Sequence, residues 1–171
     1  MQATPHTHTP TQIHYAPPLH GFTPARIAPP ARRFRGRDTD ADTDFVAMLD
    51  AYRHSGGLAR DVEVQRMLEG HAGGGMATLA GWLAQGCVIG FEWQAQTWLP
   101  RFQFLPAGPL PAHVISAVLL ELNAVYDAWE VAQWFARANS ALGGRLPVDV
   151  LNAEPRSVLD AARRDRFIAK G

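Results

Sequence analysis

The fold of this chain is constrained most by residues 126–151, YDAWEVAQWFARANSALGGRLPVDVL, where helix start and stop signals follow one another closely. Asp127 and Asn139 can each cap a helical turn, and the turn after Asn139 is expected to stop at Gly143. Pro147 suits the first turn of a further helix. Large apolar residues fill the intervals: Trp129, Trp134, Phe135, Val148, Val150 and Leu151. This short-helix segment (residues 126–151) therefore predicts one compact local shape, and no catalytic motif lies inside it.

Composition limits the chemistry that the chain can perform. Its 171 residues are 47% hydrophobic with a formal net charge of zero, which suits one domain, or two very small ones, with tails. Lys170 is the only lysine, so phosphate chemistry that requires a lysine is nearly excluded. Cys87 is the only cysteine, which excludes an intramolecular disulfide and a cysteine-based zinc cluster. A buried structural role for Cys87 is favoured over a reactive thiol.

No catalytic, cofactor-binding or metal-binding motif is recognisable along the chain. His54, His71 and His113 have no spacing that builds a site, and no carboxylate pair lies beside a plausible base or nucleophile. The chain has no apolar run of the roughly 18 residues that a membrane-spanning helix needs, and no secretory signal. We therefore expect a cytoplasmic binding protein that is not an enzyme, with no cofactor and no membrane contact.

Residues 1–43 predict a disordered tail, because proline and threonine are frequent and apolar residues are sparse. The basic cluster 31–37, ARRFRGR, is followed at once by four aspartates up to Asp44. A DNA-contacting arm and a self-neutralising solvated tail are both open, and the adjacent acids favour the second. Order is expected to begin near Asp44, a good N-cap.

Residues 44–104 predict three helices and then a β-hairpin. The helical patterns cover 45–52, 58–69 and 76–85, and the glycine-rich 70–75 reads as a turn. Apolar residues then alternate in 87–94 and 97–104, which is typical of two paired strands. Pro100 interrupts the second strand and suggests an edge position. We interpret this half as a helix-turn-helix-like region with a hairpin.

Residues 105–111 read as a proline-rich linker, and residues 112–171 as a helical domain, so the fold class is mainly α. Trp129 and Trp134 lie about 140° apart around one helix axis. This indicates either a self-association or partner surface, or two rings that belong to the core. Pro155 opens the last helix, where Asp160 can pair with Arg164. The chain end is basic and apolar, with Arg163, Arg164, Arg166, Phe167, Ile168, Lys170 and Gly171.

The motif series resembles the Xre/MbcA/ParS-type antitoxins. It comprises LP-x-FQF (99–104), W-x-x-x-x-W-F (129–135), N-x-x-LGGR-x-PVD-x-L (139–151) and P-x-x-VL-x-AA (155–162). The likeness to their C-terminal toxin-binding domain covers about 111–171, and a weaker likeness extends back to about residue 45. The motif residues beyond the two tryptophans are Asn139, Leu142, Gly143, Gly144, Arg145, Pro147, Asp149 and Leu151.

This resemblance implies a partner and a mode of action. Such antitoxins bind RES-domain toxins, which consume NAD⁺, and their C-terminal end covers the entrance to the toxin's active site. Here the matching feature is the chain end, residues 163–171. Family members typically dimerise, and many bind operator DNA through their N-terminal helices.

In the DNA-binding interpretation, 58–69 is the first helix of the motif and 76–85 the recognition helix. The second of these carries no Arg or Lys, so base contacts would fall to residues such as Thr78. Arg53, Arg60 and Arg66 could contact phosphates. The alternative function is therefore a DNA-binding regulator whose C-terminal half serves only dimerisation.

Overall fold

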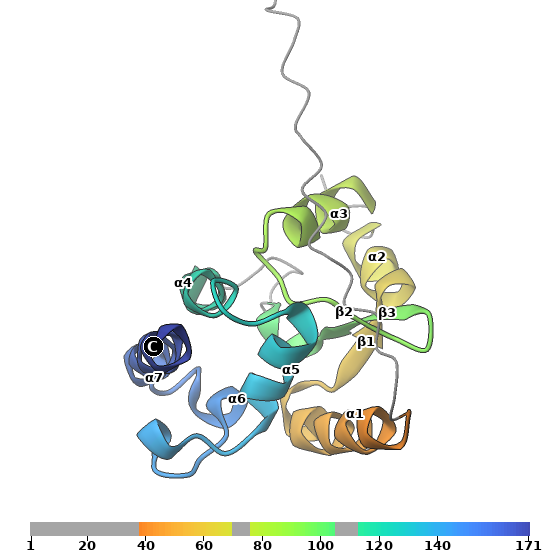
Figure 1. The fold of residues 1–171 in the computed structure, drawn as a ribbon. Helices are drawn as coiled ribbons and strands as arrows, with labels where there is room; N and C mark the ends of the chain where they lie inside the picture. Colours follow the sequence, from red (N-terminus) through yellow and green to blue (C-terminus); the bar gives the residue numbers. More distant parts are fainter. Residues whose placement is uncertain (1–37, 70–75, 105–112) are drawn as a thin grey trace, which may run out of the picture. The chain divides into compact units, whose positions relative to one another are not determined.

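The computed structural model describes residues 38–69, 76–104 and 113–171, and these lie in one unit, Gly36–Gly171. The described chain is mainly helical with a small antiparallel sheet (Figure 1). The longer helices are α1 (Asp38–Tyr52), α2 (Asp61–Glu69), α3 (Met76–Ala84), α4 (His113–Leu122), α5 (Ala128–Ala136), α6 (Pro147–Val150) and α7 (Pro155–Lys170). The remaining elements are β1 (Leu58–Arg60), β2 (Phe91–Trp93), β3 (Gln96–Pro100) and the short 3-10 helices η1 (Arg53–Ser55), η2 (Arg101–Gln103) and η3 (Ser140–Leu142). Most of the predicted tail, the glycine-rich turn and the predicted linker lie outside the described residues.

The ordered region begins earlier than predicted. Helix α1 starts at Asp38, so Asp44 is not its N-cap but an interior residue. The Asp44 carboxylate instead accepts hydrogen bonds from Gln133 Nε2 at 2.5 Å and from Arg137 Nη2 at 3.0 Å. The helix begins six residues before Asp44, so this carboxylate is available to donors of α5 and of its C-cap, Arg137.

The predicted hairpin is confirmed, with β2 and β3 joined at Gln94 and Ala95. Both residues have positive φ, 49° and 57°, as the central positions of a type I′ turn require. The predicted edge position of the second strand is wrong, because the strand order is β1-β3-β2 and β3 is central. Pro100 is tolerated there because it is the last residue of β3, opposite Leu58.

The third strand replaces the first turn of a predicted helix. Residues 58–60 form β1, and α2 begins only at Asp61. The Glu63 carboxylate accepts a hydrogen bond from the Arg60 backbone N–H at 3.0 Å, and Asp61 Oδ1 accepts one from the Val62 N–H at 2.7 Å. These acidic side chains satisfy backbone donors at the start of α2, so the helix can begin directly after the strand.

One apolar cluster joins residues from both sides of the predicted linker. It contains Phe45 and Tyr52 of α1 and Phe91 of β2, together with residues of α4, α5, α6 and α7. The Tyr52 hydroxyl donates a buried hydrogen bond of 2.5 Å to the Ala132 carbonyl oxygen of α5. A second cluster lies around α2, α3 and β3: Ala59, Val64, Leu68, Leu79, Val88, Leu99 and Phe104. The chain before residue 105 and the chain after residue 112 therefore share one core.

Helix α5 is covered by the chain itself on several sides. It contacts α1, β2 and α6. Trp129 is half-buried and meets Phe91 edge to face, with ring centroids 5.3 Å apart, and the half-buried Trp134 meets Phe135 at 5.0 Å. Both rings therefore pack against the core of their own chain, and the self-association surface remains a prediction.

Candidate functional site

The predicted start and stop signals of the short-helix segment are confirmed. Asp127 and Glu130 form a capping box, in which each carboxylate accepts a hydrogen bond of 2.9 Å from the other residue's backbone N–H. Asn139 Oδ1 accepts a hydrogen bond from the Ala141 N–H at 2.9 Å at the start of η3. Gly143 and Gly144 follow in left-handed conformation, with φ of 68° and 80°.

The other residues of this motif divide between core and surface. Leu142, Pro147 and Leu151 are buried, whereas Asp149 is exposed. Pro147 is the first residue of α6, as predicted.

Arg145 joins the short-helix segment to the start of α7. Its Nε donates a hydrogen bond to the Leu142 carbonyl oxygen at 2.9 Å, and its Nη1 and Nη2 donate to the two Glu154 carboxylate oxygens at 2.5 and 3.0 Å. This two-point contact raises the pKa of Arg145 and lowers that of Glu154. Glu154 directly precedes Pro155, so the contact fixes where the last helix begins.

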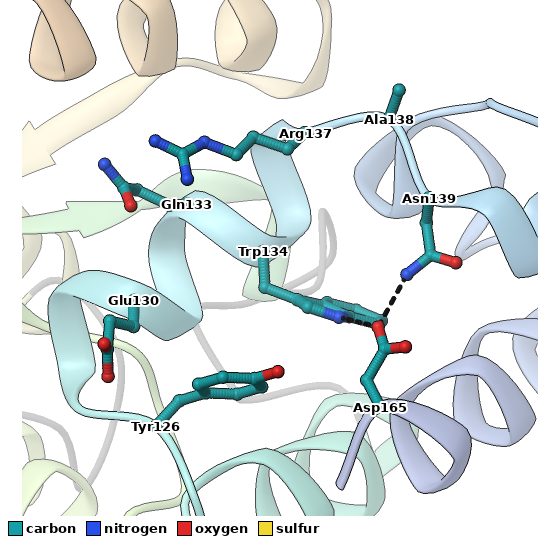
Figure 2. Close-up of a pocket in the computed structure, with 8 residues that line it drawn as sticks. All are labelled: Tyr126, Glu130, Gln133, Trp134, Arg137, Ala138, Asn139 and Asp165. Atoms are coloured by element: carbon teal, nitrogen blue, oxygen red, sulfur yellow. Dashed lines mark hydrogen bonds between the residues drawn. The ribbon is translucent and has the colours of Figure 1, made fainter. Parts of the chain in front are cut away.

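Asp165 of α7 provides a second connection between α7 and this segment. Its Oδ2 accepts hydrogen bonds from Trp134 Nε1 at 2.7 Å and from Asn139 Nδ2 at 2.8 Å (Figure 2). Sequence reasoning missed this residue. The available signal was indirect: a partly buried indole N–H usually finds an acceptor, and Asp165 is one of two acidic residues within α7.

A pocket of about 320 Å³ opens beside this contact. Figure 2 shows its lining, which is Tyr126, Glu130, Gln133, Trp134, Arg137, Ala138, Asn139 and Asp165. Burial, followed by the charges of Asp165 and Glu130, raises the pKa of Tyr126, so its phenol stays neutral at physiological pH. Arg137 is neutralised by Asp44 at 3.0 Å. The pocket thus combines aromatic rings with two carboxylates.

The apolar residues noted at the chain end are exposed at the end of α7. Phe167 is 77% and Ile168 65% exposed, and Lys170 and Gly171 are also exposed. Two arginines that precede them hold the helix to α4: Arg163 Nε lies 3.2 Å and Arg166 Nη1 lies 2.6 Å from the Glu121 carboxylate. The Glu121 side chain is only 13% exposed, so this acidic group is well placed to hold both arginines.

The predicted pairing within α7 is wrong in its partner. Asp160 pairs with Arg163 at 3.2 Å, not with Arg164. Arg163 lies one turn along the helix and lies between Asp160 and Glu121, so it interacts with both acidic groups. Arg164 is exposed. The predicted toxin-binding set therefore divides into residues that anchor α7, Arg163 and Arg166, and an exposed remainder.

The predicted DNA-contacting residues lie on four elements. Arg53 of η1 pairs with Asp50 at 2.6 Å, and Arg60 of β1 pairs with Glu63 at 3.3 Å. Arg66 is exposed on α2, and Thr78 is half-buried on α3. Helices α2 and α3 contact each other, but the turn between them lies outside the described residues.

No family model, no curated protein and no solved structure matches this chain. Among the helices that the structure describes, none is long and apolar enough to cross a membrane. The described residues also contain no group of three or more His, Cys, Asp or Glu side chains that could hold a metal ion.

Proposed function

We propose that this protein is an antitoxin that binds a RES-type, NAD⁺-degrading toxin and covers the entrance to the toxin's active site with the free end of α7. One observation carries the proposal: the last turn of α7 presents Phe167 and Ile168, which are 77% and 65% exposed. The preceding part of the helix is held to α4 by ion pairs. Adjacent, strongly exposed large apolar side chains are typical of a surface that docks on a partner.

The anchoring of α7 supports the same proposal. Glu121 holds Arg163 and Arg166, and Asp165 is held by two donors from the short-helix segment. An inhibitory segment that is already ordered before binding loses less conformational entropy in the complex. The resemblance to the antitoxin family supplies the identity of the partner, and dimerisation belongs to the same proposal.

The test is neutralisation of the cognate toxin in cells that express both proteins. We expect a chain that ends at Arg166, and a Phe167→Ala/Ile168→Ala double variant, to fold normally and to lose protection. Val46→Ala is the matched control, because Val46 is 63% exposed but lies on α1. Full protection by both end variants would refute the role of the α7 end.

A gel-shift assay with the DNA upstream of the gene distinguishes the antitoxin from the alternative, a DNA-binding regulator. It predicts a salt-sensitive, sequence-specific shift that weakens in Arg66→Gln. A specific shift by a protein that neutralises no toxin would favour the alternative. If the protein neutralises the toxin but causes no gel shift, only the antitoxin function is supported.

A further inference from the structure

The pocket between α5 and α7 has features of a binding site in its own right. Its volume of about 320 Å³ lies at the lower end for ligand pockets, which suits one large side chain or a small molecule rather than a dinucleotide. It lies next to the hydrogen bonds that hold Asp165, so its walls are fixed by the fold (Figure 2).

Its electrostatics favour a cation. Two carboxylates, Glu130 and Asp165, line the pocket, and neither is ion-paired with another described residue. The one cation in the lining, Arg137, is paired with Asp44. Asp165 receives both of its hydrogen bonds at Oδ2, and no described side chain donates to Oδ1. The negatively charged Asp165 carboxylate therefore has an oxygen, Oδ1, that can accept a hydrogen bond from an incoming donor.

The aromatic lining narrows the kind of cation. Figure 2 shows the Trp134 indole and the Tyr126 ring pointing into the same space, with the Tyr126 hydroxyl directed towards Asp165. Aromatic faces attract cations, and a planar guanidinium both stacks on such faces and donates to a carboxylate in its own plane. A compact ammonium group makes the charge contact but not the stacking contact.

We propose that this pocket binds the guanidinium group of an arginine side chain presented by a partner protein. The aromatic rings of Trp134 and Tyr126 hold its faces, and Asp165 Oδ1 accepts its N–H groups, with Glu130 adding negative charge. Its test needs only the isolated protein and a defined ligand, so the result does not depend on the toxin or on the end of α7.

The direct test is a nuclear magnetic resonance titration of the ¹⁵N-labelled full chain with N-acetyl-arginine methylamide, which mimics an arginine within a protein. We expect a saturable shift of the Trp134 indole N–H signal, with a dissociation constant on the order of millimolar for so small a ligand. The Trp129 indole, which lies outside the pocket lining, is the internal control. The citrulline analogue, which has nearly the same shape but no charge, should cause no shift.

Two variants test the charges. Asp165→Asn keeps an acceptor oxygen for the existing donors, and Glu130→Gln keeps a side chain that suits the capping box. Asp165→Asn should weaken binding roughly tenfold or more, and Glu130→Gln by less, because only Asp165 bonds the guanidinium directly. Asp160→Asn is the matched control on the same helix, and it should bind as the natural sequence does. Unchanged melting of each variant confirms that its fold is intact.

Three results would overturn the proposal. The first is no saturable shift of the Trp134 signal with the arginine mimic. The second is an equal shift with the citrulline analogue, or equal affinity in Asp165→Asn that melts normally. The third is much tighter binding of free arginine than of the mimic, which would assign the pocket to a free metabolite rather than to a protein side chain.

Discussion

Removing one buried hydroxyl group tests whether the chain folds as one unit. Tyr52 of α1 and Ala132 of α5 are both fully buried, and the hydrogen bond of 2.5 Å between them joins chain segments 80 residues apart. Burial raises the pKa of Tyr52 well above its usual value, so the hydroxyl is a neutral donor at any moderate pH. In Tyr52→Phe the aromatic ring can remain in place, but the Ala132 carbonyl oxygen keeps only its helical donor within α5 and loses the second, from the hydroxyl.

The expected cost is the net contribution of one buried hydrogen bond, about 0.5–1.5 kcal/mol, because the carbonyl oxygen keeps its helical partner. The unfolding entropy of a unit as large as Gly36–Gly171 converts this into a fall in melting temperature of about 2–5 °C. Because the core cluster spans α1 and α4 to α7, the whole unit should lose this stability together. The denaturant midpoint should fall while the slope of the transition stays the same.

The assay is urea unfolding followed by two probes. Trp93 and Trp98 of the sheet report on the first half of the chain, and Trp129 and Trp134 of α5 report on the second. Variants that keep one tryptophan pair, with the other pair and Trp82 replaced by phenylalanine, separate the two signals. Each tryptophan pair should report a single urea transition. Adding Tyr52→Phe should lower the midpoint by the same amount with either pair. Two transitions, of which only one responds to Tyr52→Phe, would refute the shared core and restore the division at residues 105–111.

The remaining predictions concern single side chains. Gln103→Leu should cost about 2–4 kcal/mol in thermal or urea unfolding, because the buried Gln103 amide bonds both the N–H and the carbonyl of Ile89 at 2.7 and 2.9 Å. Arg145→Gln should destabilise more at pH 7 than in acid: the folded-state pKa of Glu154 is lowered, so the contribution of the ion pair is present above the unfolded pKa and disappears as the pH falls through the folded value, whereas the Arg145 bond to the Leu142 carbonyl does not titrate. A pH series of melting curves checks this, and a loss of stability as large at pH 2 as at pH 7 contradicts it. Trp129→Ala should cost about 2–3 kcal/mol, less than for a fully buried ring; unchanged melting with loss of a dimer in sedimentation would instead place this ring at an interface.

Local signals in the sequence predicted the C-terminal part of the fold well. Asp127, Asn139 and Pro147 act within one helical turn of their own position, so their roles can be inferred without knowing the rest of the structure. The hairpin was recognisable for the same reason, because alternation and a short turn are local properties.

Three of the wrong predictions depend on residues that are distant in sequence. Residues 58–60 fit a helical pattern by themselves, and only pairing with β3, some forty residues later, makes them a strand. Pro100 suggested an edge strand because the first strand of the sheet was not recognised. Asp44 is an ordinary N-cap until the donors Gln133 and Arg137 approach it.

The same distinction separates the two parts of the candidate site. The exposed end of α7 could be predicted, because apolar residues near a chain end are unusual wherever the rest of the fold lies. The pocket could not, because Asp165 lies 31 residues from Trp134 and 26 from Asn139, and sequence alone gives an acidic residue in a basic helix no partner.

Asp165 connects the two parts physically. It receives the hydrogen bonds that align α7, it lines the pocket, and it precedes Phe167 by only two residues. A guanidinium bound at Oδ1 could act in two ways. It could weaken the hydrogen bonds that Oδ2 accepts from Trp134 and Asn139, by drawing negative charge towards Oδ1, or it could stabilise the position of α7 by neutralising the Asp165 charge. Since no described side chain donates to Oδ1, a guanidinium can bind there without displacing either existing donor, and we expect an arginine in the pocket to hold the end of α7 more firmly in the position proposed for docking.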